Sequence, residues 1–412
     1  MQIGKDNIHL TYCTNIHPGE GWNEVFANLK HYIPVLKSRL SPENSFGIGL
    51  RLANIAAKEL LEKDNLTQFQ SWLTNQDLYV FTLNGFPYGG FHHQVVKDAV
   101  YSPDWSTQER LDYTINLAKI LSALLPQGME GGISTLPISY KPWWKGDRIA
   151  ESHIFNSSCL NLASLTAELI TIRQQTGKLI HLDIEPEPDG LLENTTEVID
   201  FFTNWLLPVS GAILSKSLGI SPKLAKTQLL EHIRICYDTC HFAVEYENPA
   251  TVFARFQDSD IKIGKIQLSA AIKVALPTNR EVLLARLCPF AESTYLHQVI
   301  ERYSDGSLHH YPDLVTALPH LKNSKAQEWR SHFHVPIFIH DYQLLQSTQD
   351  DIVAVLQLLQ ANPVCQHLEI ETYTWDVLPP EMKIDILASI QREYEWVLQK
   401  GLAIQPQPAA IS

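Results

Sequence analysis

The sequence has few basic residues for its size and no cluster of them. Its 32 lysines and arginines stand against 45 acidic residues, so the formal net charge is −13. Because phosphate contacts by basic side chains supply most nucleic-acid affinity, we expect no nucleic-acid partner. Apolar runs that approach the roughly 18 residues of a membrane helix are also missing. We therefore expect a soluble protein without membrane insertion.

Signals for secretion and for several well-known chemistries are absent as well. The start, Met1–Asp6, has no apolar signal core, and the six cysteines form no CxxC pair. A reducing cytoplasm is therefore the expected location. The chain also lacks a GxxxxGK[ST] phosphate loop, a GxSxG nucleophile elbow, an HExxH helix and zinc-finger spacing. These absences argue against P-loop nucleotide hydrolysis and against serine hydrolysis.

What the sequence does contain is a repeated alternation of short apolar strands with longer segments of helical periodicity, the pattern of parallel βα units. Most of the strands are apolar through their middle, as strands covered on both faces are. Eight strands are predicted, at Ile8–Thr14, Phe46–Arg51, Leu78–Gly85, Gly132–Ser139, Leu179–Glu185, Ile233–Asp238, Ile263–Ser269 and His367–Tyr373. Eight units, with no GxGxxG after the first strand, favour an α/β fold of the (β/α)8 TIM-barrel type over an open Rossmann sheet.

The helices between these strands have recognisable ends. Ser221 and Pro222 provide an N-cap and a first-turn proline for a helix over Lys223–His232. Further helices are predicted at Ser106–Leu125, Cys159–Gln175, Gln349–Leu359 and Pro380–Lys400. We expect one TIM-barrel domain over residues 1–404 and a disordered tail, rich in Pro, Gln and Ala, over residues 405–412.

The spacing is irregular between the seventh and eighth predicted strands, where the chain has far more residues than one helix needs. We predict an insertion over about residues 275–340. Because barrel active sites are built from the loops that follow the strands, this insertion should lie over the barrel mouth. It contains His332 and His334, which alternate about Phe333, so that both imidazoles could point to the mouth as neutral donors or serve only a structural role.

Carboxylates gather at the end of the fifth predicted strand, in the string His181–Pro188 (HLDIEPEP). Alternation places Asp183 and Glu185 on one face, and the prolines stop the strand. A carboxylate buried at the mouth needs a partner or a cation, which makes Glu185 a candidate metal ligand or general base. A solvated acidic loop is the alternative, and Glu187 could simply be exposed.

The sixth and eighth predicted strands end in further candidates. Asp238 and His241 leave a buried strand three residues apart, which suits a divalent cation, with a structural salt bridge between them as the alternative. Glu369 and Glu371 share one face of the eighth strand. Glu371 is nearer the carboxyl end and is the better candidate, whereas Glu369 could lie deeper and pair with Arg or Lys.

Other polar and aromatic residues could contact a substrate. Gln267, on the seventh strand, could bind a cation through its amide oxygen or satisfy a backbone group. Lys273 lies just beyond that strand. Tyr88 and His93 follow the third strand and could line a ring-shaped or sugar-like ligand, with packing of a lid as the alternative. We predict substrate contacts by Lys273, Tyr88, His93 and the two inserted histidines.

Two strings resemble families of metal-dependent barrels. Asp238–His241 (DTCH) is similar to a signature of the endonuclease IV-type apurinic endonucleases. Glu185–Pro188 (EPEP) resembles the Glu-Pro-Lys-Pro segment of xylose isomerases. Both families belong to one superfamily of xylose isomerase-like TIM barrels, and Glu371 resembles the metal ligand of its last strand. The three likenesses occur in the order that the superfamily requires.

This resemblance implies that Glu185, Asp238 and Glu371 bind a divalent cation, while His241 is a further ligand or contacts substrate. The metal is open among Mn, Zn, Mg, Co and Fe. The superfamily usually has a metal-binding histidine on the seventh strand, where this chain has Gln267, so the site could be weaker or be completed by the inserted histidines. Histidines that the nuclease branch uses after its third and fourth strands are also missing.

Over nearly the whole chain the sequence resembles the EboE family of metabolite traffic proteins, which ebo gene clusters of the cyanobacterial type encode. The likeness includes Thr11–Glu20 (TYCTNIHPGE) at the start and the HFHVP run over residues 332–336. It implies involvement in making or moving a small secondary metabolite and does not identify a reaction.

Three functions are open. The first is metal-dependent isomerisation or epimerisation of a small polyhydroxylated or carbonyl-bearing metabolite, with Glu185 and Glu371 as the proton-transferring pair. The second is a carrier that binds such a metabolite without turnover, which Gln267 in place of a histidine favours. The third is apurinic endonuclease activity, which the acidic charge and the missing histidines disfavour. The oligomeric state is open, a homo-oligomer included.

Overall fold

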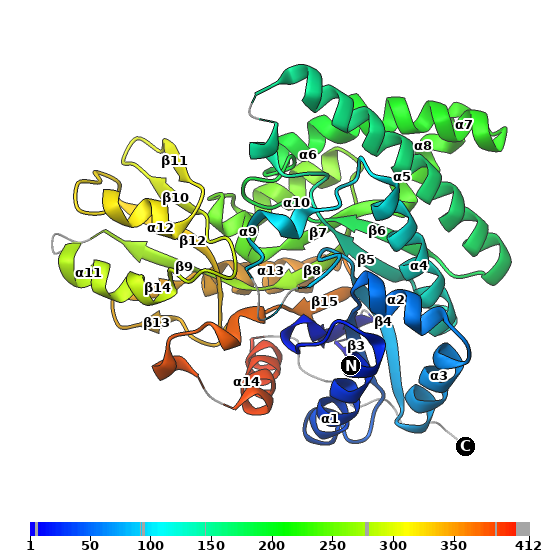
Figure 1. Ribbon diagram of the computed structural model, residues 1–412, viewed down its shortest axis with the longest axis horizontal. Helices are drawn as coiled ribbons and strands as arrows, with labels where there is room; N and C mark the ends of the chain where they lie inside the picture. The colour runs from blue at the N-terminus through cyan, green and yellow to red at the C-terminus, as the bar shows by residue number, and fades with distance from the viewer. Residues whose placement is uncertain are drawn as a thin grey trace.

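The structure, a computed structural model, describes residues 1–4, 7–90, 92, 95–144, 146–276, 280–383 and 385–400. Eight parallel strands form the predicted barrel, in the predicted order along the chain (Figure 1). They are β2 (Ile8–Tyr12), β3 (Phe46–Arg51), β4 (Leu78–Asn84), β5 (Gly131–Thr135), β6 (Ile180–Ile184), β7 (Ile233–Asp238), β8 (Ile263–Leu268) and β15 (His367–Ile370). A short strand, β1 (Gln2–Ile3), pairs antiparallel with β2. The expected tail, residues 405–412, lies outside the described residues.

The barrel is nearly closed. Its first and second strands, β2 and β3, lie next to each other, but no regular ladder of hydrogen bonds joins them. One parallel bridge joins Cys13 to Gly49. The Thr11 side chain fills the gap below it: its hydroxyl donates to Gly47 O at 3.0 Å and accepts from the Gly49 amide at 2.8 Å. A Cβ at Gly49 would collide with the Glu369 carboxylate. Glycine at this position therefore makes room for a charged side chain inside the barrel.

Helices surround the strands and cover their apolar outer faces. They are α1 (Trp22–Leu40), α2 (Asn54–Leu61), α3 (Asn65–Asn75), α4 (Gln108–Leu124), α5 (Arg148–Thr176), α6 (Thr195–Phe201), α7 (Gly211–Leu218), α8 (Pro222–His232), α9 (Thr239–Val244), α10 (Pro249–Asp258), α13 (Gln349–Ala361) and α14 (Ile386–Gln399). Short 3-10 turns occupy Thr14–Ile16, Lys97–Tyr101, Lys141–Trp143, Cys288–Phe290, Leu318–His320, Tyr373–Asp376 and Pro380–Met382. The described residues form one dominant hydrophobic core between the strands and these helices.

Side-chain caps set several helix starts. Ser221 caps α8 as predicted, with its hydroxyl accepting from the Leu224 amide at 3.2 Å. Asp147 caps α5 through the Ile149 and Ala150 amides. That cap lies twelve residues before the predicted start at Cys159, so the helix is longer at its N-terminus than predicted. α14 begins only at Ile386, since Pro380–Met382 forms a separate 3-10 turn.

One helical stretch, Thr195–Leu218, is long and apolar enough to cross a membrane by length and composition alone. It joins α6 and α7 through a π-helical segment, Phe202–Ser210. The stretch packs against α5 and α8 in the outer layer of the barrel. The sequence does not mark it as a membrane helix, because Glu197, Asp200 and Lys216, together with several Thr, Asn and Ser residues, interrupt its apolar run. Absence of membrane insertion stays a prediction.

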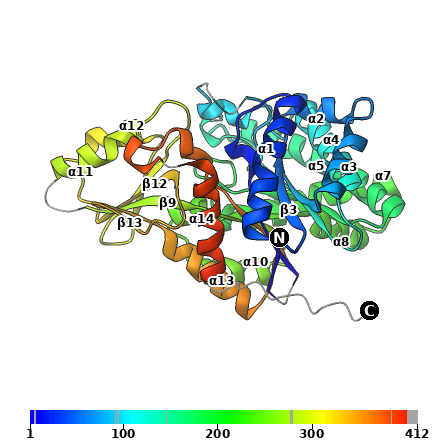
Figure 2. The same ribbon diagram turned by 90° about the horizontal axis from the view of Figure 1, so that it is seen from below.

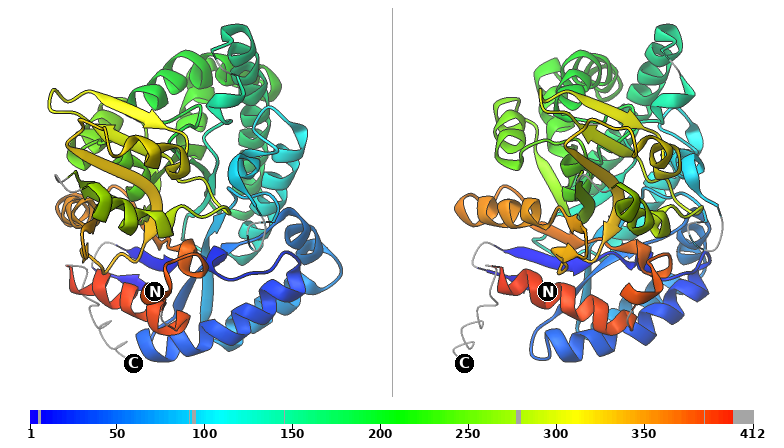
Figure 3. Two further views of the ribbon diagram at one scale, coloured as in Figure 1. Left: turned by 60° about the vertical axis from the view of Figure 1, so that its left-hand side comes forward. Right: turned by 90° about the vertical axis from the view of Figure 1, so that its left-hand side faces the viewer.

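The chain between β8 and α13 forms the predicted insertion, and it folds as a six-stranded antiparallel sheet with the strand order β11-β10-β12-β9-β14-β13. Its elements are β9 (Ala270–Ala275), α11 (Arg280–Leu287), β10 (Val299–Arg302), β11 (Leu308–Tyr311), α12 (Leu314–Ala317), β12 (Glu328–Val335), β13 (Asp341–Tyr342) and β14 (Leu345–Ser347). Figures 1 and 2 show this sheet at one side of the barrel, and Figure 3, turned toward that side, shows its yellow strands in front of the barrel.

Candidate metal centre

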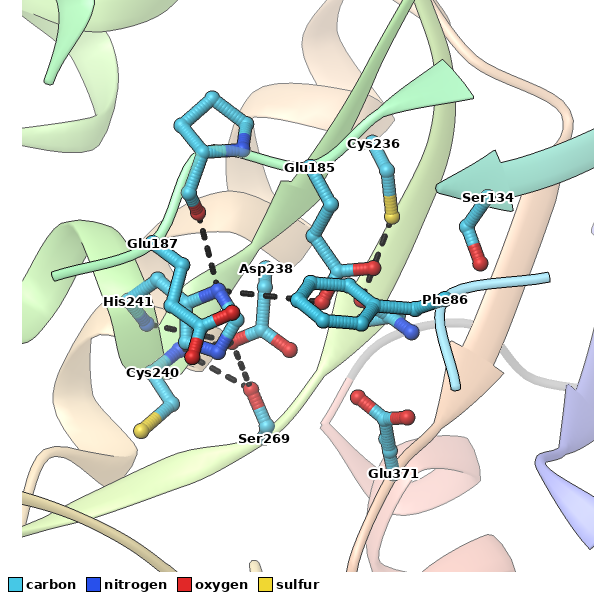
Figure 4. A network of polar contacts seen from close by, with 12 residues as sticks. Phe86, Ser134, Glu185, Glu187, Cys236, Asp238, Cys240, His241, Ser269 and Glu371 are labelled. Carbon is cyan, nitrogen blue, oxygen red and sulfur yellow. Dashed lines mark hydrogen bonds and ion pairs between the residues drawn. The ribbon is translucent and has the colours of Figure 1, made fainter. Parts of the chain in front are cut away.

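The carboxyl ends of three barrel strands bring three carboxylates together. Glu185 follows β6, Asp238 ends β7 and Glu371 follows β15. One carboxylate oxygen from each lies within 4.8 Å of the others. Figure 4 shows the three side chains converging from their separate strands. All three are buried, with 3%, 0% and 5% exposure respectively. The predicted grouping of these carboxylates at one point is therefore a feature of the structure.

No lysine or arginine among the described residues forms an ion pair with these carboxylates. Oε2 of Glu185 and Oδ2 of Asp238 are buried and have no hydrogen-bond partner in the described part of the chain. Burial, and then the charges of Glu371 and Asp238, raise the pKa of Glu185 well above its usual range. Burial and the neighbouring Asp238 raise the pKa of Glu371 in the same way. Such carboxylates are costly to ionise unless a cation joins them.

Asp238 is held in place by the start of α9. Its Oδ1 accepts from the amides of Cys240 at 2.8 Å and His241 at 3.1 Å, and from the Ser269 hydroxyl at 2.6 Å. Although burial opposes ionisation, the imidazoles of His241 and His334 and the Ser269 hydrogen bond hold the pKa of Asp238 below its usual value. The result is an ionised carboxylate with one oxygen anchored and the other pointing at the cluster.

Glu371 is held by two amide side chains at the ends of other strands. Its Oε1 accepts from Nδ2 of Asn15, just after β2, at 2.8 Å and from Nδ2 of Asn84, the last residue of β4, at 3.1 Å. Sequence reasoning missed both asparagines. The signal that could have found Asn84 is its position at the carboxyl end of a predicted strand, where a barrel collects polar groups.

Three histidines lie beside the carboxylates, and in each of them Nδ1 already makes a hydrogen bond. Nδ1 of His241 donates to Pro186 O at 2.9 Å, and Nδ1 of His334 donates to Glu371 O at 2.7 Å. Nδ1 of His332 lies 2.8 Å from Oε1 of Gln298. An oxygen that can only accept requires the proton on Nδ1, so Nε2 keeps its lone pair. Nε2 of both His332 and His334 is buried without a partner in the described residues.

These imidazoles extend the carboxylate cluster. Ligand atoms of Asp238, His241 and His334 lie within 4.8 Å of one another. The rings of His241 and His332 are 4.6 Å apart between centroids. Burial lowers the pKa of His334 to about 4, which leaves its imidazole neutral near pH 7. Imidazoles whose Nδ1 is already bound, next to carboxylates that no lysine or arginine among the described residues pairs with, form a donor set that fits a divalent cation.

The cluster opens into a cavity between the barrel and the insertion. Of the predicted site residues, the cavity is lined by Glu185, Glu371, His241, His332 and His334. Phe86 and Pro87, from the aromatic loop that the sequence proposed as a ligand wall, also line it. The lining residues that the sequence did not propose are Asn15, Asn84, Val96, Lys97, Val100, Tyr295, Leu296 and Tyr373. Tyr295 and Leu296 belong to the insertion and carried no sequence signal. Glu187, which the sequence left ambiguous, is a buried lining residue, and burial raises its pKa to about 7.

The remaining predicted residues lie elsewhere. Gln267 is fully buried on β8, where its Oε1 accepts from the Cys236 thiol at 3.2 Å, and it does not line the cavity. Tyr88 lies outside the lining, because the turn after β4 directs its ring edge-on to Tyr113. Lys273 lies on β9, opposite Arg330 in the insertion sheet, and outside the lining. His93 falls outside the described residues. Roles for these four residues stay predictions.

No family model matches this chain. No curated protein matches it in sequence. Several solved structures are similar to it. A 3-keto-D-glucoside 4-epimerase (YcjR) from E. coli is 11% identical, with 95% of this chain and 99% of that chain covered and a TM-score of 0.44.

Two further solved structures have a similar coverage. The IolI protein with a zinc atom is 10% identical, with 95% and 98% of the two chains covered and a TM-score of 0.48. A D-psicose 3-epimerase from Clostridium cellulolyticum H10 is 10% identical, with 95% and 97% covered and a TM-score of 0.45. At these identities and TM-scores the likenesses carry no conclusion about what this chain does, so its chemistry has to be inferred from its own residues.

Proposed function

We propose that Glu185, Asp238 and Glu371 hold a divalent cation at the barrel mouth, with His241 and His334 beside it. The supporting observation is that three buried carboxylates converge with no lysine or arginine paired to them among the described residues. Burying a carboxylate without a partner costs roughly several kcal/mol per ion in lost hydration. A bound cation offsets this cost. The mixed oxygen and nitrogen donors suit Mn, Zn, Mg, Co or Fe.

On this basis the protein is a metal-dependent isomerase or epimerase of a small polyhydroxylated or carbonyl-bearing metabolite. A bound divalent cation supplies Lewis-acid stabilisation of negative charge on a carbonyl or hydroxyl oxygen. Glu185 and Glu371 line the cavity from opposite strands of the cluster, so one can remove a proton from a substrate carbon and the other can return one. Asn15 and Asn84 fix one oxygen of Glu371 and leave the carboxylate aimed at the cavity.

The cavity suits a small polar ligand with a carbon skeleton. The rings of Phe86, Tyr295 and Tyr373 form part of its wall, while carboxylates and imidazoles form the floor. Tyr295, supplied by the insertion, and Tyr373, after β15, contact each other edge-on with centroids 5.0 Å apart. Together the insertion and the barrel restrict water at the cluster, which strengthens electrostatic interactions there.

The finer assignment rests on sequence likeness. The resemblance to the EboE family supports a metabolite of an ebo-type secondary pathway as the substrate class. A carrier that holds the metabolite without turnover is the rival within the same site. The enzyme and the carrier differ in one step, proton transfer to and from the substrate, which a carrier does not perform.

The test is exchange of the substrate α-proton. Metal-loaded protein would be incubated in deuterated water with a panel of aldoses, ketoses and keto-glycosides, and incorporation followed by NMR. We expect exchange with at least one compound, and loss of more than 100-fold in the Glu371→Gln variant, with Glu43→Gln, an exposed residue, as the control. Binding of a panel compound to metal-loaded protein without exchange would overturn the enzyme proposal and favour the carrier.

A further inference from the structure

A second cluster of metal-ligating side chains lies at the opposite end of the barrel strands. Glu130 precedes β5, His181 is the second residue of β6 and His367 is the first residue of β15. One ligand atom from each lies within 4.8 Å of the others. His181 and Glu185 are four residues apart on one strand, which is roughly 13 Å along it. The second cluster is therefore separate from the mouth.

The imidazoles of this cluster have buried nitrogens that no described group satisfies. Nε2 of His181 has no hydrogen-bond partner, and neither ring nitrogen of His367 has one. The two side chains are 0% and 1% exposed. Each such nitrogen costs roughly 1–3 kcal/mol in lost solvation. The rings lie nearly parallel, 5.5 Å apart between centroids. Both imidazoles therefore have a ring nitrogen that is available to a shared ligand.

The remaining nitrogen of His181 is oriented by a carboxylate. Nδ1 of His181 lies 2.6 Å from Oδ1 of Asp183. Glycines on β5 and β8 make this contact feasible, because a Cβ at Gly132 or Gly264 would collide with the Asp183 carboxylate. Because Nδ1 is bound to Asp183, Nε2 is the ring nitrogen left to bind a ligand, as in zinc-binding histidines whose other nitrogen is bound to a carboxylate.

The third group, Glu130, is a carboxylate held in place by an arginine. Nη1 and Nη2 of Arg234 donate to its two oxygens, both at 3.2 Å. Each carboxylate oxygen keeps a second lone pair after accepting from Arg234. Glu130 is also 25% exposed at its side chain, so the cluster has a route to solvent.

We propose that Glu130, His181 and His367 form a second divalent-metal site, of the zinc type, at the end of the barrel opposite the mouth. Two imidazoles and one carboxylate are a ligand set that zinc prefers over magnesium or calcium. The site joins β5, β6 and β15, which are far apart in sequence. The bound ion would therefore stabilise the folded barrel, and its binding is independent of the chemistry proposed for the mouth.

The test uses a protein whose mouth is disabled, the Asp238→Asn/Glu371→Gln double variant. It would be titrated with Co²⁺, followed by visible absorption, and with Zn²⁺, followed by elemental analysis after gel filtration. We expect one equivalent of metal, with the absorption of a four-coordinate Co²⁺ ion, and a rise in the melting temperature. Absence of metal from the folded double variant would overturn the proposal.

Further substitutions in the double variant locate the ion. His367→Asn and Glu130→Gln should each weaken binding at least 10-fold. Glu231→Gln is the matched control, because Glu231 also contacts Arg234, at 3.6 Å, but is not part of the cluster. Because Glu130 is partly exposed, we expect Glu130→Gln to fold even if His367→Asn does not. Its metal affinity then tests the site. Unchanged affinity in Glu130→Gln, or an equal loss in Glu231→Gln, would contradict the assignment.

Discussion

Two glutamates on one strand show how differently the barrel treats its middle and its mouth. Glu369 and Glu371 lie two residues apart on the same face at the end of β15. Glu369 forms an ion pair with Lys265, and both side chains are fully buried. Glu371 instead accepts from two asparagine amides and approaches two further carboxylates. A carboxylate in the middle is therefore neutralised by the protein, whereas one at the mouth depends on something that the protein must bind.

The largest expected effect separates these two glutamates by stability. Glu369→Gln leaves Lys265 as an uncompensated buried charge, so we expect the free energy of unfolding to fall by roughly 3–5 kcal/mol. Glu371→Gln replaces a buried carboxyl group that has no counter-ion in the metal-free protein, and we expect no loss of stability. Urea unfolding at pH 7 with a chelator measures both. Equal destabilisation by the two substitutions would contradict the claim that the protein neutralises Glu369 but not Glu371.

Glu393 on α14 shows a third way to bury a carboxyl group, as a neutral acid. Its Oε1 accepts from the Thr372 hydroxyl at 2.7 Å, and burial raises its pKa to about 8 from an ordinary value of 4.5. Between these pH values the folded state keeps a proton that the unfolded state has lost. The contribution of Glu393 to stability is therefore complete below about pH 4.5 and decreases as the pH rises to about 8.

The Glu393→Gln variant should remove this dependence. We expect it to be as stable as the wild type near pH 5 and more stable by roughly 2–4 kcal/mol near pH 8. Urea unfolding at the two pH values, again with a chelator, provides the comparison. A variant that is less stable than the wild type at pH 8 would show that Glu393 is ionised in the folded protein.

At the mouth, Asp238→Asn should abolish metal binding without unfolding the barrel. Asparagine keeps an oxygen for the amides of Cys240 and His241, so the cap of α9 survives while the ligand charge is lost. We expect the affinity for Mn²⁺ at the mouth to fall more than 100-fold in calorimetric titrations. Asp258→Asn, at an exposed position near the end of α10, is the matched control. Undiminished affinity would remove Asp238 from the site.

The smallest expected effect comes from the residues that position Glu371. Asn84→Ala removes one of its two amide donors and leaves the carboxylate free to rotate. Loss of a group that orients a metal ligand typically weakens binding by roughly 10–100-fold, and we expect the lower end here because Asn15 remains. Calorimetric titration with Mn²⁺ measures the change, and no change would mean that Asn84 does not position the ligand.

The sequence predicted the frame of the mouth better than its details. Apolar strands and the order of the units indicated the barrel, and carboxylates at strand ends indicated the cluster, because the carboxyl ends of parallel strands meet at one edge. Asn15 could not be predicted, since its contact with Glu371 spans 356 residues and depends on closure of the barrel. Most strands end earlier than predicted, as β5 does at Thr135 rather than Ser139, whereas β3 and β7 have the predicted bounds.

The cluster at the end of the barrel opposite the mouth could not be predicted from the sequence, for the same reason. His181 and His367 each read as an isolated histidine in an apolar strand, and their contact depends on strand order and register. The insertion was predicted in place, but its antiparallel sheet was not, because short polar strands such as Leu308–Tyr311 pair only through their partners. Long-range pairing, rather than local pattern, carries the information that the sequence analysis lacked.

The most direct test of the metal centre is anomalous diffraction from crystals soaked in Mn²⁺. The account predicts a peak at about 2.0–2.6 Å from carboxylate oxygens of Glu185, Asp238 and Glu371. Loss of that peak in Asp238→Asn crystals, with the rest of the barrel unchanged, would show that Asp238 holds the ion. A wild-type map with Mn²⁺ bound elsewhere in the protein and no peak among these three carboxylates would contradict it.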